Sequence, residues 1–220
     1  MIEVAISVTL AGLPYVADEI LGTNDVMAPL FVCVIGPMLV TMPVWRSAAV
    51  RMGKKSCLVA ASLVYAAGAS AVLGLPATTE TLRFEVACAA CLVAGIGLSG
   101  LSLLPQAMLA DTLAVDAAES GQRRAGVLAG VWSAAETVSA AAGAGIYGLV
   151  LAASGFVSSS SDESIVQPRS AEWGIVFGFS GISVVAVVAA LRLLTGYTLT
   201  EDAAEELVLA RQHERGASQG

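Results

Sequence analysis

The chain has 220 residues, a length that would suit one or two soluble domains. Its composition excludes a soluble surface, because charged residues make up only 13% of it, against about 25% in a typical soluble domain. Hydrophobic residues make up 56%, and the mean hydropathy is +0.79, which also excludes intrinsic disorder. A net charge of −7 with no basic patch argues against nucleic acid as a partner. The composition therefore predicts an integral membrane protein.

Six apolar runs are long enough to cross a bilayer, since a spanning helix needs about 20 mostly apolar residues. Charged residues, turns or prolines mark their ends. The runs cover residues 4–21, 27–45, 56–75, 84–109, 126–153 and 173–194. The sequence predicts an all-α membrane protein with a six-span transmembrane bundle over residues 1–197.

The basic residues predict how the bundle is oriented, because lysines and arginines collect in cytoplasmic loops. Of the 11 lysines and arginines, all except Arg83 and Arg169 lie after the second or fourth run, or at and beyond the end of the sixth. We expect a protein of the cell membrane with both termini cytoplasmic. Residues 198–220 form the expected cytoplasmic tail, with a short helix that starts at the capping-box spacing of Thr198 and Glu201. The amino-terminal residues do not resemble a secretory signal peptide.

Two short motifs suggest nucleotide or metal binding, but we interpret both structurally. Gly95, Gly97 and Gly100 match G-x-G-x-x-G, yet they lie inside an apolar run rather than between a strand and a helix. Small residues at such spacings let membrane helices approach closely. The fifth run carries two more pairs of this kind: Ala141 with Gly145, and Ala144 with Gly148.

Cys88-x-x-Cys91 has the spacing of half a zinc site, but no second pair follows, and the single histidine of the chain, His213, lies in the tail. We expect these cysteines to be hydrophobic filler. No nucleophile–base pair and no metal-ligand set occurs in the sequence, so we expect no enzyme, no catalytic residue, no metal and no cofactor.

Glu136 lies inside the fifth apolar run, where a carboxylate costs about 2.5–3.5 kcal/mol on insertion scales. Trp132, Glu136, Ser139 and Gly143 recur at i, i+4, i+7 and i+11, and so form one stripe of a helix. Two interpretations remain open. Glu136 is either a structural carboxylate bonded to a neighbouring helix, or a group on a substrate or ion pathway, which is the usual role of intramembrane carboxylates.

The region from the fourth to the fifth run resembles the glycoside–pentoside–hexuronide:cation symporters, the melibiose-permease group of the major facilitator superfamily. It reads LPQAMLAD at residues 104–111, then Asp116, then SGQRRAG at residues 120–126. MPVW at residues 42–45 and RMGKK at residues 51–55 are similar to the loop between that family's eighth and ninth spans. The chain departs from the pattern at Ala114, where the family often has Asp, and at Thr137, where it commonly has Lys.

The resemblance implies the carboxyl-terminal half of a twelve-span fold. Its expected function is secondary active transport of a sugar-like or other small organic solute, coupled to a cation or a proton. Sites in such transporters lie between two halves. The expected partners are therefore membrane lipid, the solute, the coupling cation or proton, and either a missing six-span amino-terminal half or a second copy. The residues expected at the cavity are Glu136, Trp132, Thr137, Ser139, Tyr15 and Gln106.

Asp111, Asp116, Arg123 and Arg124 are expected to form a cytoplasmic gate, in which carboxylate–guanidinium pairs hold one conformation closed. At least one arginine–carboxylate contact is expected within this loop or to the loop after the second run. Such pairs are worth only about 0–1 kcal/mol at a surface, which suits a gate that must open. The alternative is a solvated loop whose arginines only set the topology. A different function also stays open: a non-transporting membrane module that binds or regulates a partner through its small-residue faces.

Overall fold

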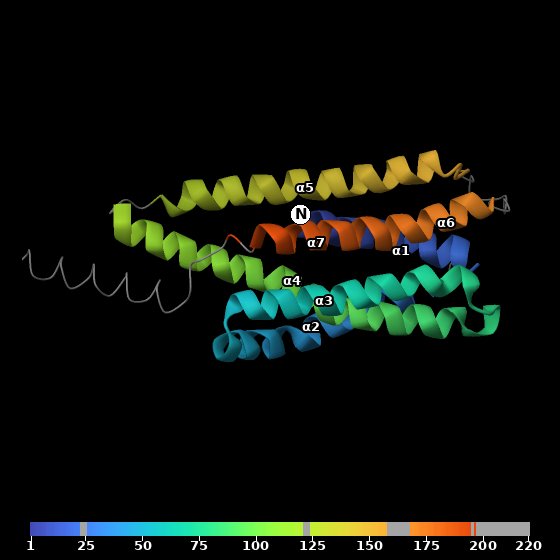
Figure 1. Cartoon of the computed structure of the whole chain (residues 1–220), viewed down its shortest axis with the longest axis horizontal. Coiled ribbons are helices and arrows are strands. Elements are labelled where there is room, and N and C mark those ends of the chain that lie inside the picture. Colours follow the sequence, from blue (N-terminus) through green and yellow to red (C-terminus); the bar gives the residue numbers. More distant parts are fainter. Residues whose placement is uncertain (23–25, 121–123, 158–167, 195, 197–220) are drawn as a thin grey trace, which may run out of the picture.

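The computed structural model describes residues 1–22, 26–120, 124–157, 168–194 and 196, and the predicted tail helix lies outside them. Within these ranges the chain is helical and contains no strand. The helices run along one long axis (Figure 1). The elements are α1 (Ile2–Tyr15), η1 (Val16–Ile20), α2 (Met27–Met52), α3 (Lys54–Ala71), η3 (Val72–Ala77), α4 (Glu80–Ser120), α5 (Ala125–Ala153), α6 (Arg169–Phe177), η4 (Gly178–Ile182) and α7 (Ser183–Leu194).

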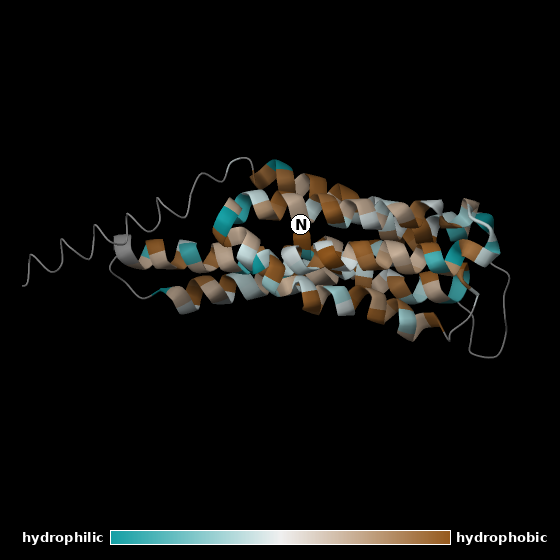
Figure 2. Cartoon of the chain, turned by 90° about the horizontal axis from the view of Figure 1, so that it is seen from below, coloured by the Kyte–Doolittle hydropathy of each residue, from teal (hydrophilic) through white to brown (hydrophobic). Residues whose placement is uncertain are grey.

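Five helices in the described ranges are long and apolar enough to cross a membrane. They correspond to the second to sixth predicted runs, the last of them formed by α6, η4 and α7 together. The first run corresponds to α1, which has 14 residues and is continued to Ile20 by the π-helix η1. Figure 2 shows the hydrophilic residues mostly toward the ends of the helices and the hydrophobic residues along them. An all-α membrane protein is thus confirmed.

Two predicted boundaries are wrong, because a charged residue ends an apolar run without ending a helix. The second run was expected to end at residue 45, but α2 continues through Arg46 and Arg51 to Met52. The residue that caps it is Gly53, whose φ of 81° is a backbone angle that glycine adopts readily and other residues rarely adopt. The fourth run was expected to end at residue 109, but α4 continues to Ser120 and carries Asp111 and Asp116 on the helix rather than in a loop.

The helices α2 and α3 approach α4 closely. A Cβ added at Gly95 would collide with the backbone oxygen of Val34 in α2, and one at Gly97 would collide with the backbone nitrogen of Tyr65 in α3. A Cβ at Gly100 would meet Ala61. The glycines of the G-x-G-x-x-G match are therefore confirmed as helix-packing residues.

The small-residue pairs of α5 behave differently. Ala141, Ala144, Gly145 and Gly148 are all exposed, and a Cβ at either glycine would meet no atom within 4 Å. Within the described part of the chain, these pairs pack against no other helix. The helix α5 touches the bundle through another face, where Gly143 lies against Val4 and Ser7 of α1.

Candidate functional site

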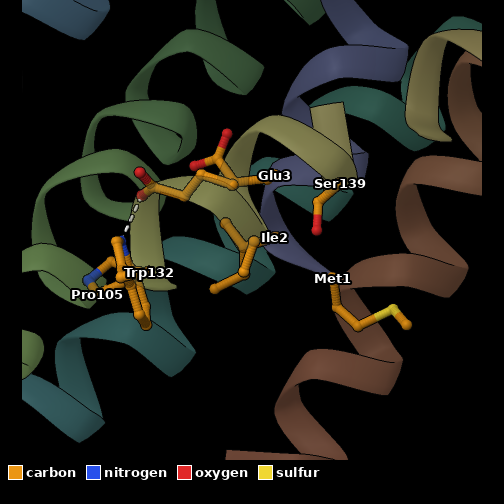
Figure 3. Close-up of a pocket in the computed structure, with 8 residues that line it drawn as sticks. Met1, Ile2, Glu3, Pro105, Trp132 and Ser139 are labelled. Carbon is orange, nitrogen blue, oxygen red and sulfur yellow. Dashed lines mark hydrogen bonds between the residues drawn. The ribbon is translucent and has the colours of Figure 1, made fainter. Parts of the chain in front are cut away.

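A cavity of about 190 Å³ lies between the beginning of α1, the middle of α4 and the first half of α5. Figure 3 shows its lining side chains. Most of the wall is apolar, and the polar side chains are two carboxylates, one indole and one hydroxyl. The lining residues are Met1, Ile2, Glu3, Pro105, Trp132, Ala135, Glu136 and Ser139.

Glu136 is held in this cavity by its own helix. The indole Nε1 of Trp132, one turn earlier, donates a hydrogen bond of 2.6 Å to Oε1 of Glu136, drawn dashed in Figure 3. Both side chains are half-buried. A hydrogen bond to a carboxylate in surroundings of low dielectric constant is strong, and it fixes the direction of the acceptor. Trp132 therefore orients one oxygen of Glu136.

The stripe predicted on α5 faces α1. Ser7 Oγ donates a 2.6 Å hydrogen bond to the carbonyl oxygen of Ala140, and Gly143 lies against the same turn of α1. Further along both helices, Gly12 of α1 lies against the ring of Tyr147 of α5. Residue numbers rise together along the contact, so the two helices run parallel. This packing places Glu136 beside the first turn of α1.

Glu3 is the charged cavity residue that the sequence did not reveal. It is in the first turn of α1, and Figure 3 shows its side chain next to the bond between Trp132 and Glu136. Its proximity depends on α1 lying parallel to α5, because the two carboxylates are far apart in sequence. The signal that was present, a carboxylate at the start of an apolar run, indicates an intramembrane site only once that packing is known.

The structure groups only part of the predicted cavity set. Trp132 and Ser139 line the cavity with Glu136, but Thr137, Gln106 and Tyr15 do not. Thr137 is exposed and donates to the carbonyl oxygen of Ser133 in its own helix, and Gln106 is also exposed.

Tyr15 belongs to an aromatic cluster at the other end of α1. Its ring centroid lies 5.7 Å from that of Tyr147 and 5.4 Å from that of Phe156, the latter edge-on. Both distances suit favourable aromatic pairs. The structure therefore gives Tyr15 a packing role between α1 and α5.

The predicted gate contains an ion pair to the segment after the second apolar run, one of the two places where a partner was expected, but the partner is a lysine and not an arginine. Lys54 Nζ, at the start of α3, donates to both carboxylate oxygens of Asp111 in α4, at 2.8 and 2.6 Å. The two side chains are only 20% and 26% exposed. Arg124 is the exposed residue before α5, and Arg123 lies outside the described residues. Asp111 is thus paired with a lysine rather than with one of the predicted arginines.

The cysteines are free thiols that pack in the bundle. Cys91 is buried in the hydrophobic core and Cys88 is half-buried against it. Across the described ranges, no three His, Cys, Asp or Glu side chains are grouped as they would be to hold a metal ion.

Helices of this length and composition, packed through glycines and surrounded by exposed apolar side chains, define a multi-pass membrane protein. The chain belongs to the family described as MFS/sugar transport protein, which it matches over residues 3–201. It is also 30% identical over 199 residues to an uncharacterized symporter of Synechocystis sp.. That match covers 89% of this chain and 36% of the relative, so the chain spans about a third of the relative's length. No solved structure matches the chain significantly. Both similarities are to transport proteins.

Proposed function

We propose that the chain is the carboxyl-terminal half of a secondary active transporter similar to the melibiose permeases. Paired with a six-span amino-terminal half or with a second copy, it carries a sugar-like or other small organic solute together with a cation or a proton. The family and the symporter relative support transport. The match covers 36% of the relative, which supports a partner that is at least as long as this chain.

The observation that carries the proposal is the oriented carboxylate in the cavity. Glu136 is on a membrane helix, half-buried, and holds its position through Trp132. A carboxylate at such a depth is costly when ionised and unpaired. A coupling proton or cation that neutralises Glu136 lowers that cost, and this makes occupancy of the cavity sensitive to the ion. Ser139 and the indole of Trp132 supply a hydroxyl and an aromatic face for a polar solute.

Two helices offer the surface on which the partner half would bind. In the apolar 18-residue segment of each helix, only 11% of the residues of α2 and 17% of those of α5 are buried, against 56% for α4. Sites in transporters built from repeats lie where two repeats meet and rock against each other. We place the partner on the open faces of α2 and α5, so that the cavity beside Glu136 lies near the junction.

The gate is proposed at the end of α4, with Asp111, Asp116, Arg123 and Arg124 as its charged residues and Lys54 as the partner of Asp111. With the basic residues on the cytoplasmic side of the membrane, the gate, both termini and the tail of residues 198–220 are also cytoplasmic. The ion pair joins α3 to α4, and opening it exposes two charges to water, which costs little at a membrane surface.

Uptake measurements test this function. The chain is coexpressed with the amino-terminal half of a related symporter, and uptake of labelled sugars is measured in membrane vesicles with and without a proton gradient. In Glu136→Gln we expect gradient-driven uptake to fall about tenfold or more, which corresponds to at least about 1.4 kcal/mol of lost coupling.

The matched control is Glu85→Gln, which removes the same charge from an exposed position near the start of α4. It should transport like the unmodified protein. Unchanged gradient-driven uptake in Glu136→Gln, with normal amounts of protein in the membrane, would contradict the role of Glu136.

A further inference from the structure

Tyr65 of α3 is hydrogen-bonded to α1 inside the bundle. Its hydroxyl is bonded to Thr9 Oγ1 and lies 3.2 Å from the carbonyl oxygen of Ala5, and both Tyr65 and Thr9 are fully buried. Thr9 Oγ1 itself donates to the carbonyl oxygen of Ala5, at 2.9 Å, so it accepts the proton of Tyr65. The oxygen of Tyr65 therefore keeps a lone pair that can accept one more hydrogen bond.

Ser183, the first residue of α7, is the residue that could donate this bond. The helix α7 packs against both α1 and α3, and the side chain of Ser183 is close enough to Tyr65 for the two hydroxyls to interact. Ser183 is fully buried, yet among the described residues its Oγ has no hydrogen-bond partner with suitable geometry. A buried hydroxyl without a partner destabilises the conformation that contains it, because its lost hydration is not replaced.

The π-helix η4 directly precedes Ser183 in the same span. A π-helix within an α-helix carries an extra residue in its turn, and such turns occur frequently at functional sites. Ser180 of η4 donates a hydrogen bond to the carbonyl oxygen of Ala69 in α3, which attaches this part of the span to α3. A change in the backbone hydrogen bonds after Ser180 therefore moves Ser183 while the span stays attached to α3.

Ser99 of α4 provides a comparison within the same molecule. It is also fully buried, and its Oγ likewise has no hydrogen-bond partner in the part of the chain that the structure describes. Its surroundings differ in one respect, because α4 is α-helical from Glu80 to Ser120 and no π-helix adjoins Ser99. Two equally buried serines thus differ in whether the backbone beside them has an extra residue.

We propose that the span formed by α6, η4 and α7 has a second conformation, in which η4 rearranges and Ser183 donates a hydrogen bond to Tyr65. The structure shows the conformation without this bond. One buried hydrogen bond favours the second conformation by about fivefold, and the rearranged backbone of η4 opposes it, so both conformations are populated. This change lies apart from the cavity beside Glu136 and does not depend on the transported solute.

Thermal unfolding of the full chain in detergent tests the proposal with two matched variants. Ser99→Ala removes a buried hydroxyl that has no partner, so we expect the unfolding midpoint to rise by about 2–4 °C. Ser183→Ala removes a similar hydroxyl but also the bond of the second conformation, so its midpoint should stay unchanged or fall. A rise in Ser183→Ala as large as that in Ser99→Ala would overturn the proposal.

The same substitution in a Tyr65→Phe background identifies the partner of Ser183. Tyr65→Phe loses the bond to α1 and should unfold at a lower temperature, but circular dichroism establishes whether it keeps its helix content. Because phenylalanine cannot accept the bond, adding Ser183→Ala to this variant should raise the midpoint as Ser99→Ala does. The same effect of Ser183→Ala with and without the Tyr65 hydroxyl would overturn the assignment of Tyr65 as the acceptor.

Amide hydrogen exchange of the unmodified chain tests the rearrangement of η4 without any substitution. Residues 178–180 should exchange about tenfold faster than residues 97–99 of α4, which are also buried, because the backbone bonds of η4 open each time the conformation changes. Ser183→Ala should reduce this difference, since it removes the bond that favours the second conformation. Exchange as slow in η4 as in α4 would show a single backbone arrangement and overturn the proposal.

Discussion

The helices α4 and α5 carry similar small-residue patterns and have opposite surroundings. In α4, Gly95, Gly97 and Gly100 each touch a neighbouring helix, and 56% of the apolar window is buried. In α5, Gly145 and Gly148 face open space, and 17% is buried. The comparison shows that such a pattern permits close approach of a helix, but does not say whether the approaching helix belongs to the same chain.

The largest expected effect comes from filling the α4 contacts. Gly97→Leu places a side chain against the backbone of Tyr65, where no side chain can give way. We expect a loss of stability of about 3 kcal/mol or more, or failure to fold, because overpacking a rigid core forces backbone shifts. Thermal unfolding in detergent measures it, with Gly145→Leu as the control of equal size. A similar loss in both variants would show that α4 and α5 do not differ as described.

A second prediction compares two faces of α5. Gly143→Leu meets the backbone oxygen of Val4 and the side chain of Ser7, so it should cost about 1–3 kcal/mol, while Gly145→Leu on the same helix changes stability by less than about 0.5 kcal/mol. When the amino-terminal half is supplied, Gly145→Leu should instead weaken association of the halves in pull-down measurements. Association unaffected by Gly145→Leu would argue that this face of α5 contacts lipid.

Two tryptophans sharpen the comparison further. Trp45 Nε1 in α2 donates to the carbonyl oxygen of Ile96 in α4, at 2.8 Å, whereas Trp132 of α5 donates to Glu136. Trp45→Phe should lower stability by about 1 kcal/mol, because one hydrogen bond between helices is lost. Trp132→Phe should lower uptake, and it should also lower stability by about 1 kcal/mol, because it removes a hydrogen bond to a carboxylate. The reverse result, a stable Trp45→Phe and an unfolded Trp132→Phe, would refute the assignment of packing to α4 and function to α5.

The smallest effect concerns the ion pair between α3 and α4. A double-mutant cycle with Lys54→Met and Asp111→Asn should give a coupling energy of at most about 1 kcal/mol, since both groups are partly exposed to solvent. Unfolding at low and high salt checks it, and the coupling should decrease with salt. A coupling that salt leaves unchanged would mean that the pair is shielded and structural rather than able to open as a gate.

Much of the fold followed from the sequence, because apolar runs separated by charges identify membrane helices directly. The local part of the site followed as well: Trp132 and Ser139 share a helix with Glu136, and helical spacing alone places them together. The predicted helix ends at residues 45 and 109 were wrong because an arginine or an aspartate ends an apolar run without ending a helix.

What the sequence did not reveal depends on contacts between helices. Glu3 reaches the cavity only because α1 packs parallel to α5, and Lys54 reaches Asp111 only because α3 begins beside the second half of α4. Tyr15, expected at the cavity, finds aromatic partners in Tyr147 and Phe156 instead. A single sequence contains no register between distant helices, so these pairs required the structure.

The single residue between α2 and α3 has a mechanical consequence. With only Gly53 as a connection, the Cα atoms of Met52 and Lys54 stay within about 7.6 Å of each other, so the two helices cannot slide independently along their axes. A displacement of α2 along its axis therefore also moves Lys54, the first residue of α3. Through this short connection, a shift of α2 also changes the position of Lys54 in its bond to Asp111.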